Sequence, residues 1–139
     1  MSAIVACPSC GTKNRLQPIP KGHLRCGRCK QVLSWVVDAD ERSFDEETNA
    51  SVPVVVDFWA DWCAPCRMIA PVLAALASEH AGRFKVVKVD VDAAPQLAAR
   101  WQAMRIPLLV VIRDGREVDR IVGALPEPQL QQRLAPILA

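Results

Sequence analysis

Two features are missing from this chain of 139 residues, and each absence excludes a class of protein. No apolar run approaches the roughly 18 residues that a helix needs to cross a bilayer, so we expect no membrane-spanning helix. No basic residue precedes Lys13, and only Ala3–Ala6 forms an apolar stretch before Cys7. A secretory signal peptide needs a basic start and about 7–15 apolar residues. We therefore expect a cytoplasmic protein, whose thiols are kept reduced and serve as metal ligands or catalytic groups.

Acidic residues are absent from the first 30 residues, which contain six basic ones. Residues 31–139 contain the other 11 basic residues and all 15 acidic ones. The net charge of +2 therefore averages a basic segment and an acidic one, and it argues against a general nucleic-acid binder. The six cysteines divide at the same place, with four before residue 31 and two after it. The sequence predicts two parts, a module at 1–31 and a domain at 32–139, and its 51% hydrophobic residues allow a buried core.

The four cysteines of the basic segment form two C-x-x-C pairs with fifteen residues between them. Zinc sites use such pairs, because one short turn holds two thiolates about 3.5–4 Å apart and a second turn completes the tetrahedron. Pro8, Gly11 and Gly27 suit these tight turns. About thirty residues cannot bury enough apolar surface to fold alone, so the metal would supply folding energy. The sequence predicts a zinc-ribbon module with Zn²⁺ bound by four ligands: Cys7, Cys10, Cys26 and Cys29.

Other interpretations of this module remain open. The four cysteines could form two disulfides or stay free, and His23 could replace one ligand. If zinc is bound, oxidation of the thiolates would release it, so the site could be a redox switch. The basic side chains could offset the negative charge of the zinc–thiolate site or bind a partner. One hypothesis is that they dock on the acidic stretch at 38–47 of the same chain. No interleaved aromatic residues support nucleic-acid binding, so we expect charge compensation and protein contact.

The rest of the chain alternates between strand and helix patterns. The β-branched and aromatic run Val52–Ala60 is typical of a strand buried on both faces. The Ala- and Leu-rich segment Cys63–His80 predicts a helix, with a kink at Pro71. Further strands are predicted at 32–37, 84–91, 108–112 and 117–122, and Asp114-Gly115 is the predicted hairpin turn between the last two. Further helices are predicted at 44–50, 95–102 and 126–138, and Ser43 is the expected N-cap of the first of them. The expected fold class is α/β, with a central mixed sheet flanked by helices on both faces.

The sequence Trp62-Cys63-Ala64-Pro65-Cys66 lies between the buried strand and the long helix. Cys63 is then at the helix N-terminus, where the macrodipole and the free amides favour a thiolate. Cys66 is one turn further on and deeper in the helix. We expect Cys63 to attack a substrate disulfide and Cys66 to resolve the mixed disulfide. A third zinc knuckle is the alternative, but no partner pair remains for it.

Asp57 is the single charge in the predicted buried strand. Burial raises the pKa of a carboxyl group, and a carboxyl group of raised pKa near a dithiol suits a proton acceptor for Cys66. Lys88 on the next predicted strand could tune Asp57 by proximity. The alternatives are an ordinary edge-strand charge for Asp57 and a solvated lysine for Lys88, because Lys85, Lys88 and Asp90 also fit a partly exposed strand.

Pro107 begins a predicted strand, a place where proline removes a backbone donor. A cis Ile106–Pro107 bond close to the active-site turn is one interpretation, although most X–Pro bonds are trans. Exposed backbone beside it could pair with an extended substrate.

The segment from about residue 32 to residue 139 resembles the thioredoxin family. With the four-cysteine segment added, the whole chain resembles the zinc-containing thioredoxin 2 type within that family. The matching motifs are Val56-Asp57-Phe58-Trp59-Ala60, Trp62-Cys63-Ala64-Pro65-Cys66, Lys88, Ile106-Pro107, Asp114-Gly115, Val122-Gly123-Ala124-Leu125 and Cys26-Gly27-Arg28-Cys29.

The resemblance implies a thioredoxin fold in which Cys63 is the nucleophile, Cys66 the resolving thiol, and buried Asp57 is coupled to Lys88. It also implies a cis Pro107 and a substrate groove formed by Trp62, Ala64, Pro65, Ile106 and Gly123. No organic cofactor would be bound, and electrons would come from NADPH through a thioredoxin reductase. Two positions depart from the family: Ala64 stands where glycine is usual and stiffens the turn, and Leu108 stands where threonine is usual and makes the groove more apolar.

The function predicted from these features is a protein-disulfide reductase acting on oxidised protein substrates, with neither membrane nor nucleic acid as a partner. Two alternatives stay open. One is a disulfide oxidase or isomerase, which a high reduction potential would favour. The other is a zinc-ribbon adaptor or redox-sensitive chaperone whose dithiol domain mainly binds partners.

Overall fold

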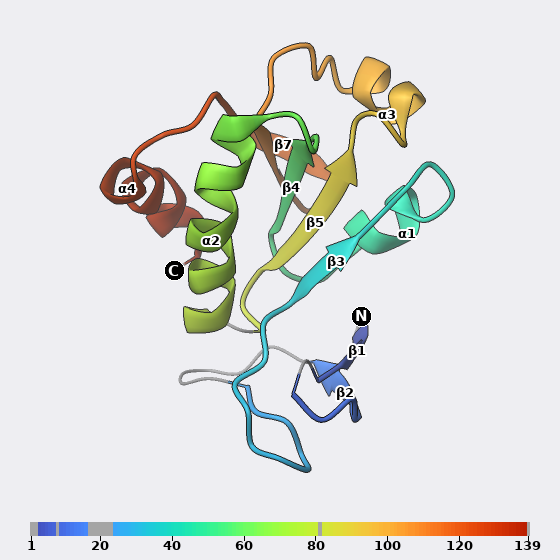
Figure 1. The fold of residues 1–139 in the computed structure, drawn as a ribbon, viewed down its shortest axis with the longest axis vertical. Helices are drawn as coiled ribbons and strands as arrows, with labels where there is room; N and C mark the ends of the chain where they lie inside the picture. The colour runs from blue at the N-terminus through green and yellow to red at the C-terminus, as the bar shows by residue number, and fades with distance from the viewer. Residues whose placement is uncertain (1–2, 8, 17–23, 81, 139) are drawn as a thin grey trace.

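The computed structural model describes residues 3–7, 9–16, 24–80 and 82–138, which form a smaller and a larger part (Figure 1). In the smaller part, β1 (Ala3–Ala6) pairs with β2 (Lys13–Leu16) in an antiparallel hairpin. An isolated antiparallel bridge joins Arg25 to Val32. Sequence patterns predicted a short ribbon here but not these strands, because four-residue strands carry too little periodicity to be recognised.

The larger part is built on a five-stranded sheet with the spatial order β3-β5-β4-β6-β7. Its strands are, in chain order, β3 (Val36–Asp38), β4 (Val54–Trp59), β5 (Lys85–Asp90), β6 (Leu108–Arg113) and β7 (Arg116–Val122). The first three are parallel, whereas β6 and β7 run antiparallel to their neighbours. Central β4 is apolar except for Asp57, as befits a strand that is covered on both faces.

Four helices cover this sheet: α1 (Phe44–Thr48), α2 (Ala64–Glu79), α3 (Pro95–Arg100) and α4 (Glu127–Leu138). One hydrophobic core packs α2 and α4 against one face through residues such as Leu73 and Leu134. A second core packs α1 and α3 against the other face through Phe44 and Leu97. The mixed sheet with helices on both faces confirms the predicted fold class. No helix among the described residues combines the length and the apolar character that a bilayer crossing requires.

The predicted order of strands and helices in the larger part is confirmed, with two local differences. Strand β3 is shorter than the predicted strand at 32–37, because Leu33 and Trp35 are buried in a third apolar cluster beside the cysteine module. Ser43 does occupy the N-cap of α1, but its side chain forms no capping hydrogen bond. Instead, an Asp40 carboxylate oxygen accepts hydrogen bonds from the backbone amides of Arg42 and Ser43 at 2.9 and 3.1 Å.

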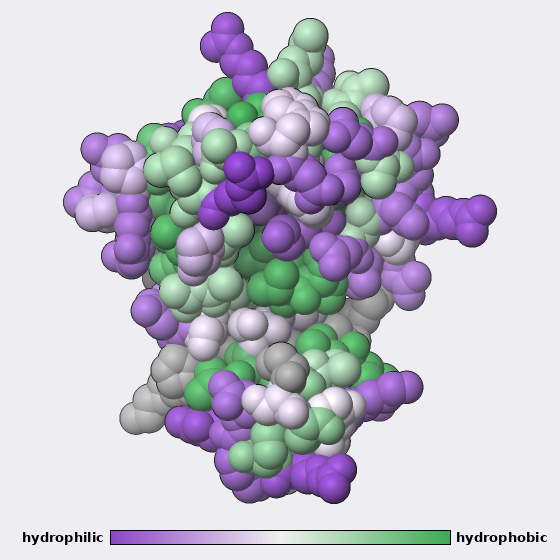
Figure 2. Space-filling model, viewed as in Figure 1, coloured by the Kyte–Doolittle hydropathy of each residue, from purple (hydrophilic) through white to green (hydrophobic). Residues whose placement is uncertain are grey.

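Apolar contact joins the two parts. The third cluster contains Cys7 and Cys26 of the module together with Leu33, Trp35 and Val52, and the molecule narrows between the two parts (Figure 2).

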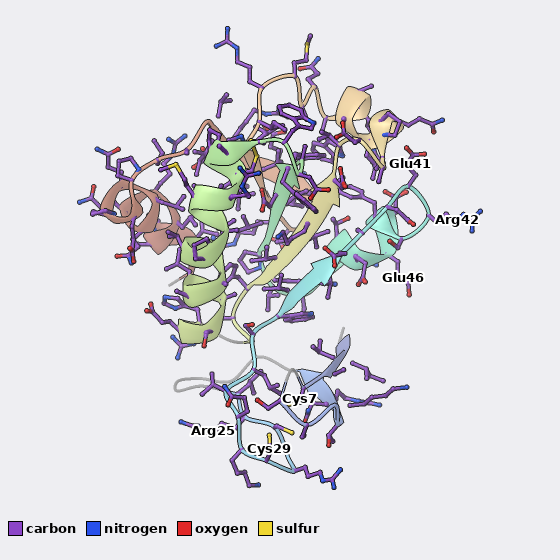
Figure 3. All side chains as sticks on the ribbon, in the orientation of Figure 1. Cys7, Arg25, Cys29, Glu41, Arg42 and Glu46 are labelled. Atoms are coloured by element: carbon purple, nitrogen blue, oxygen red, sulfur yellow. A yellow bond between two sulfur atoms is a disulfide. The ribbon has the colours of Figure 1, made fainter. Side chains whose placement is uncertain are left out.

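The predicted electrostatic docking of the basic segment on the stretch 38–47 is wrong for the described residues. There the acidic stretch forms ion pairs only with Lys85 and Arg100 of the larger part. Figure 3 agrees, since Arg25 lies in the lower part of the view, whereas Glu41 and Glu46 lie higher, on the larger part.

Candidate functional site

A disulfide between Cys63 and Cys66 lies at the start of α2, and the two Cα atoms are 5.3 Å apart. Cys63 is the N-cap residue, and its sulfur accepts a hydrogen bond from the backbone amide of Cys66 at 3.2 Å. Pro65 lies in the first turn, and Pro71 lies inside a helix that continues to Glu79. The structure therefore places the two cysteines where the sequence predicted them.

The two cysteines are equally buried, since each is 4% exposed. They differ in their hydrogen bonding, because the Cys63 sulfur accepts from the Cys66 amide. The first turn of α2 contains no acidic residue that would oppose a thiolate. A thiolate on Cys63 would face the positive end of the helix dipole and already has a backbone donor. This environment favours Cys63 as the sulfur that carries negative charge.

Asp57 lies on β4 beneath α2 and is 1% exposed. It lines a partly enclosed cavity of about 60 Å³, together with Ala70 and Leu73 of α2. One of its carboxylate oxygens is buried without a hydrogen-bond partner in the described part of the chain. Burial raises the pKa of Asp57 to about 6, and the opposing effect of the nearby Lys88 charge is smaller. A carboxyl group with this pKa can accept a proton near neutral pH.

Lys88 is the register partner of Asp57 on the neighbouring strand, and it lines the same cavity. Its ammonium nitrogen lies 5.0 Å from the centre of the Trp59 ring, so the ring stabilises its charge. The structure therefore brings Asp57 and Lys88 together. The alternative of a partly exposed strand fails at Lys85, which is only 4% exposed.

The Ile106–Pro107 peptide bond is cis, as the family resemblance implied. Ile106 packs against a buried cluster that contains both Cys63 and Cys66. The carbonyl oxygen of Pro107 accepts a hydrogen bond from the Gly123 amide at 2.8 Å. Gly123 has a φ of +85°, which favours glycine, and a Cβ atom placed there would meet nothing within 4 Å. The surface beside the cis bond is therefore open.

Trp62, Ala64 and Pro65 are exposed around the disulfide. The indole N–H of Trp62 donates a hydrogen bond of 2.8 Å to the Asp92 carboxylate, which orients a side chain that is 67% exposed.

Sequence reasoning missed Asp92 and also two exposed methionines, Met68 and Met104. Met68 follows Cys66 by two residues, and Met104 precedes Ile106 by two residues. Their closeness in sequence to Cys66 and to Ile106 was the only signal that could have pointed to these two methionines. Flexible methionine side chains suit surfaces that bind varied partners.

The four cysteines of the module lie within 4.8 Å of one another, measured between sulfur atoms. The sulfurs of Cys7 and Cys29 are 3.5 Å apart, and those of Cys10 and Cys26 are 3.6 Å apart. These distances are too long for disulfide bonds, and all four cysteines are free. A tetrahedral zinc ion with bonds of about 2.3 Å requires sulfurs about 3.8 Å apart. The donor set and its spacing therefore fit Zn²⁺, whereas His23 falls outside the described residues.

The two C-x-x-C turns share one backbone pattern. In each, the first cysteine's carbonyl accepts from the amide four residues later, Gly11 or Lys30, at 2.9 and 3.0 Å. Both of these residues have positive φ angles, 75° and 67°. The repeated turn presents each pair of sulfurs to the same point, as a metal site requires.

Asn14 connects the two turns, and sequence reasoning did not identify it. Its amide group donates to the Cys26 sulfur at 3.4 Å and to the Thr12 carbonyl at 2.9 Å. Its carbonyl oxygen accepts from the Gly27 amide at 2.9 Å. A second donor to the Cys26 sulfur is the Arg28 amide at 3.4 Å. Such N–H···S bonds stabilise metal-bound thiolates.

Comparison with known proteins gives a consistent result. The sequence model described as "Thioredoxin" matches residues 35–136. A protein named "Thioredoxin 1" from Nostoc sp. is 43% identical over 103 residues, which cover 73% of this chain and 96% of that protein. A protein named "Thioredoxin" from Staphylococcus aureus is 46% identical over 99 residues, which cover 71% of this chain and 91% of that protein. The four-cysteine module lies outside the matched family segment.

Proposed function

The chain belongs to the thioredoxin family and is a thiol–disulfide oxidoreductase, and from this premise we propose that it is a protein-disulfide reductase of the zinc-containing thioredoxin 2 type. The observation that carries this proposal is the disulfide at the N-terminus of α2, the helix that covers the buried carboxyl group of Asp57. The proposal includes a cytoplasmic location and a division into a zinc module, residues 1–31, and a thioredoxin domain, residues 32–139.

In the first proposed step, the Cys63 thiolate of the reduced protein attacks a disulfide of an oxidised protein. One substrate sulfur leaves as a thiolate, and the other is joined to Cys63 in a mixed disulfide. The Cys66 amide, which donates to the Cys63 sulfur in the oxidised form, stabilises the thiolate before the attack. The exposed Trp62, Ala64 and Pro65, with Ile106 and Gly123, form the proposed substrate surface.

In the second step, Asp57 takes the proton of the Cys66 thiol, and the Cys66 thiolate attacks Cys63. The second substrate thiolate leaves, and the Cys63–Cys66 disulfide forms. Two electrons have then passed from the dithiol to the substrate. The cavity next to Asp57 can hold a water molecule that relays the proton. Lys88 partly offsets the rise that burial causes in the pKa of Asp57, and cis Pro107 shapes the backbone where the substrate binds.

A thioredoxin reductase, using NADPH, is the proposed source of the electrons that regenerate the dithiol. The proposed zinc ion, bound by Cys7, Cys10, Cys26 and Cys29, is structural, and it supplies folding energy to a module that lacks a large core of its own. Two observations support this role: the two C-x-x-C turns have the same backbone hydrogen-bond pattern, and Asn14 forms hydrogen bonds that connect them. No organic cofactor is needed for this chemistry.

Insulin reduction driven by NADPH and a bacterial thioredoxin reductase tests the proposal. The wild-type protein should turn over, whereas Cys63→Ser should lose all activity. Cys66→Ser should also lose turnover but accumulate a mixed disulfide with the substrate, visible as a mass increase that dithiothreitol reverses. The absence of turnover with every reductase tried would contradict the reductase function, and trapping by Cys63→Ser instead would reverse the roles of the two thiols.

A further inference from the structure

Three charged residues lie in one row across the sheet. Asp38 on β3 is the register partner of Lys88 on β5, and Lys88 is the register partner of Asp57 on β4. Register partners on adjacent strands direct their side chains to the same face. Lys88 therefore lies between two carboxylates, Asp57 in the buried part of the row and Asp38 at its exposed edge.

Lys88 also lies between two hollows on this face of the sheet. The inner one is the cavity of about 60 Å³ that contains Asp57. The outer one is an open pocket of about 340 Å³ lined by Asp38, Asp40, Asp90 and the ring of Trp59. Lys88 lines both. Its ammonium group can therefore face either the buried carboxylate or the outer ones.

Of the three outer carboxylates, only that of Asp38 makes no hydrogen bond within the described part of the chain. One oxygen of Asp40 accepts from the amides of Arg42 and Ser43, and one oxygen of Asp90 accepts from the Asp92 amide at 2.9 Å, so backbone donors of their own loops hold both carboxylates in place. Asp38 accepts no hydrogen bond and forms no ion pair within the described part of the chain. Lys88 likewise forms no close ion pair there, and its ammonium group lies over the Trp59 ring.

We propose that Asp38 is a positioning residue that acts through Lys88. Its carboxylate draws the ammonium group toward the outer pocket and so limits the pairing of Lys88 with Asp57. This inference rests on the acid–base role proposed for Asp57. It adds a residue that adjusts this role from outside the dithiol, the cavity beside Asp57 and the substrate surface.

The direction of the effect follows from the surroundings of Asp57. From α2, Ala70, Leu73 and Ala74 line the cavity, and the β6 register partner is Leu109, so these elements place no charge there. Lys88 is the group whose charge lowers the pKa of Asp57. Without Asp38 the Lys88 ammonium is free to approach Asp57, and that pKa should fall.

Carboxyl ¹³C NMR titration of Asp57 in the full-length, zinc-loaded, oxidised protein tests this inference. We expect Asp38→Asn to lower the pKa of Asp57 by about half a pH unit, the size that a partly solvated charge produces. Asp38→Glu should keep the wild-type value. The control Glu46→Gln removes one negative charge from an exposed position of α1, which packs against the opposite face of the sheet, and should leave the titration unchanged.

A second background separates positioning from a direct field effect. In Lys88→Met, the additional change Asp38→Asn should no longer move the pKa of Asp57. A shift of the same size in that background would contradict action through Lys88, and an unmoved titration in Asp38→Asn alone would overturn the inference. Neither outcome depends on activity, whereas failure of the proposed function would appear in the insulin assay of the wild-type protein.

Discussion

At the scale of single residues, Asp57 couples the stability of the fold to pH. Its carboxyl group has an ordinary pKa of 3.8, and burial raises this pKa to about 6. Between these two values the folded protein binds more protons than the unfolded chain. The free energy of unfolding therefore falls as the pH rises from about 4 to about 6, and it stays lower above that range.

Asp57→Asn should remove this penalty. We expect the variant to be more stable than the wild type by about 2–3 kcal/mol at pH 8, with no difference near pH 4. Urea unfolding at both pH values measures the effect. Asp61→Asn, which neutralises an exposed carboxylate close to the disulfide, serves as the control and should change little at either pH. Equal stability of Asp57→Asn and wild type at pH 8 would mean that the buried carboxylate is not penalised.

Asn14 is the residue whose loss should weaken the metal site without removing a ligand. Asn14→Ala deletes a donor to the Cys26 sulfur and an acceptor for the Gly27 amide. We expect the zinc affinity to fall by roughly 10-fold or more, which competition with a chromogenic chelator measures. Gln31→Ala is the matched control, because Gln31 is exposed and accepts the hydrogen bond of the Cys26 amide through its backbone carbonyl, which alanine keeps. Equal affinities in the two variants would refute the role of Asn14.

At the scale of secondary-structure elements, Lys85 connects three segments. Its ammonium group donates to the Glu47 carbonyl at the end of α1 at 2.6 Å and to the Glu47 carboxylate at 2.9 Å. The same group lies 5.3 Å from the centre of the Trp35 ring, which packs in the cluster next to the module. A buried charge is stable here because each of its neighbours compensates it.

Lys85→Met keeps the length of the side chain but removes these interactions. We expect a loss of about 1–3 kcal/mol in the free energy of unfolding, because the α1 carbonyl loses its donor. Glu47→Gln should cost less, since the carbonyl bond remains and the Glu47 side chain is partly exposed. Guanidinium unfolding measures the free energy of unfolding of both variants. A larger loss in Glu47→Gln than in Lys85→Met would mean that the ion pair, and not the bond to the carbonyl, provides the stabilisation.

The elements of the larger part could be predicted because each has a clear pattern. The continuous apolar run of β4 and the Ala- and Leu-rich helix α2 gave their types and approximate bounds. Strand β3 was less predictable, because the apolar residues at 32–35 that extend its pattern are buried against the module instead. A run of apolar residues in the sequence indicates that they are buried, but it does not indicate which part of the molecule buries them.

The candidate site was predictable where the chemistry lies in the sequence itself. Cys63, Cys66 and the four module cysteines are found by their spacing, and Asp57 by its charge in an apolar run. Contacts between distant segments were not predictable, as the bonds from Trp62 to Asp92 and from Asn14 to Cys26 show. Such pairs depend on the folded backbone, and neither partner stands out locally.

At the scale of the whole molecule, each face of the thioredoxin sheet has its own core, and only the third cluster depends on the module. Removing zinc with a chelator should therefore unfold the module and expose Trp35, while insulin reduction continues at more than half of its initial rate. Tryptophan fluorescence, amide exchange and the insulin assay, followed in parallel, test this separation. Activity that falls in step with the bound zinc would show that the two parts do not function independently.

The disulfide lies at one end of α2, and the module lies beyond the other end (Figure 1). A helix of 16 residues is about 24 Å long. Thiol–disulfide exchange requires the attacking sulfur to touch the disulfide, so this separation is far too large for it. The Cys63–Cys66 disulfide therefore cannot oxidise the module cysteines of its own chain. Any transfer of oxidation between the two sets of sulfurs requires a collision of two molecules. Its initial rate should rise with the square of the protein concentration, so dilution alone would protect the module.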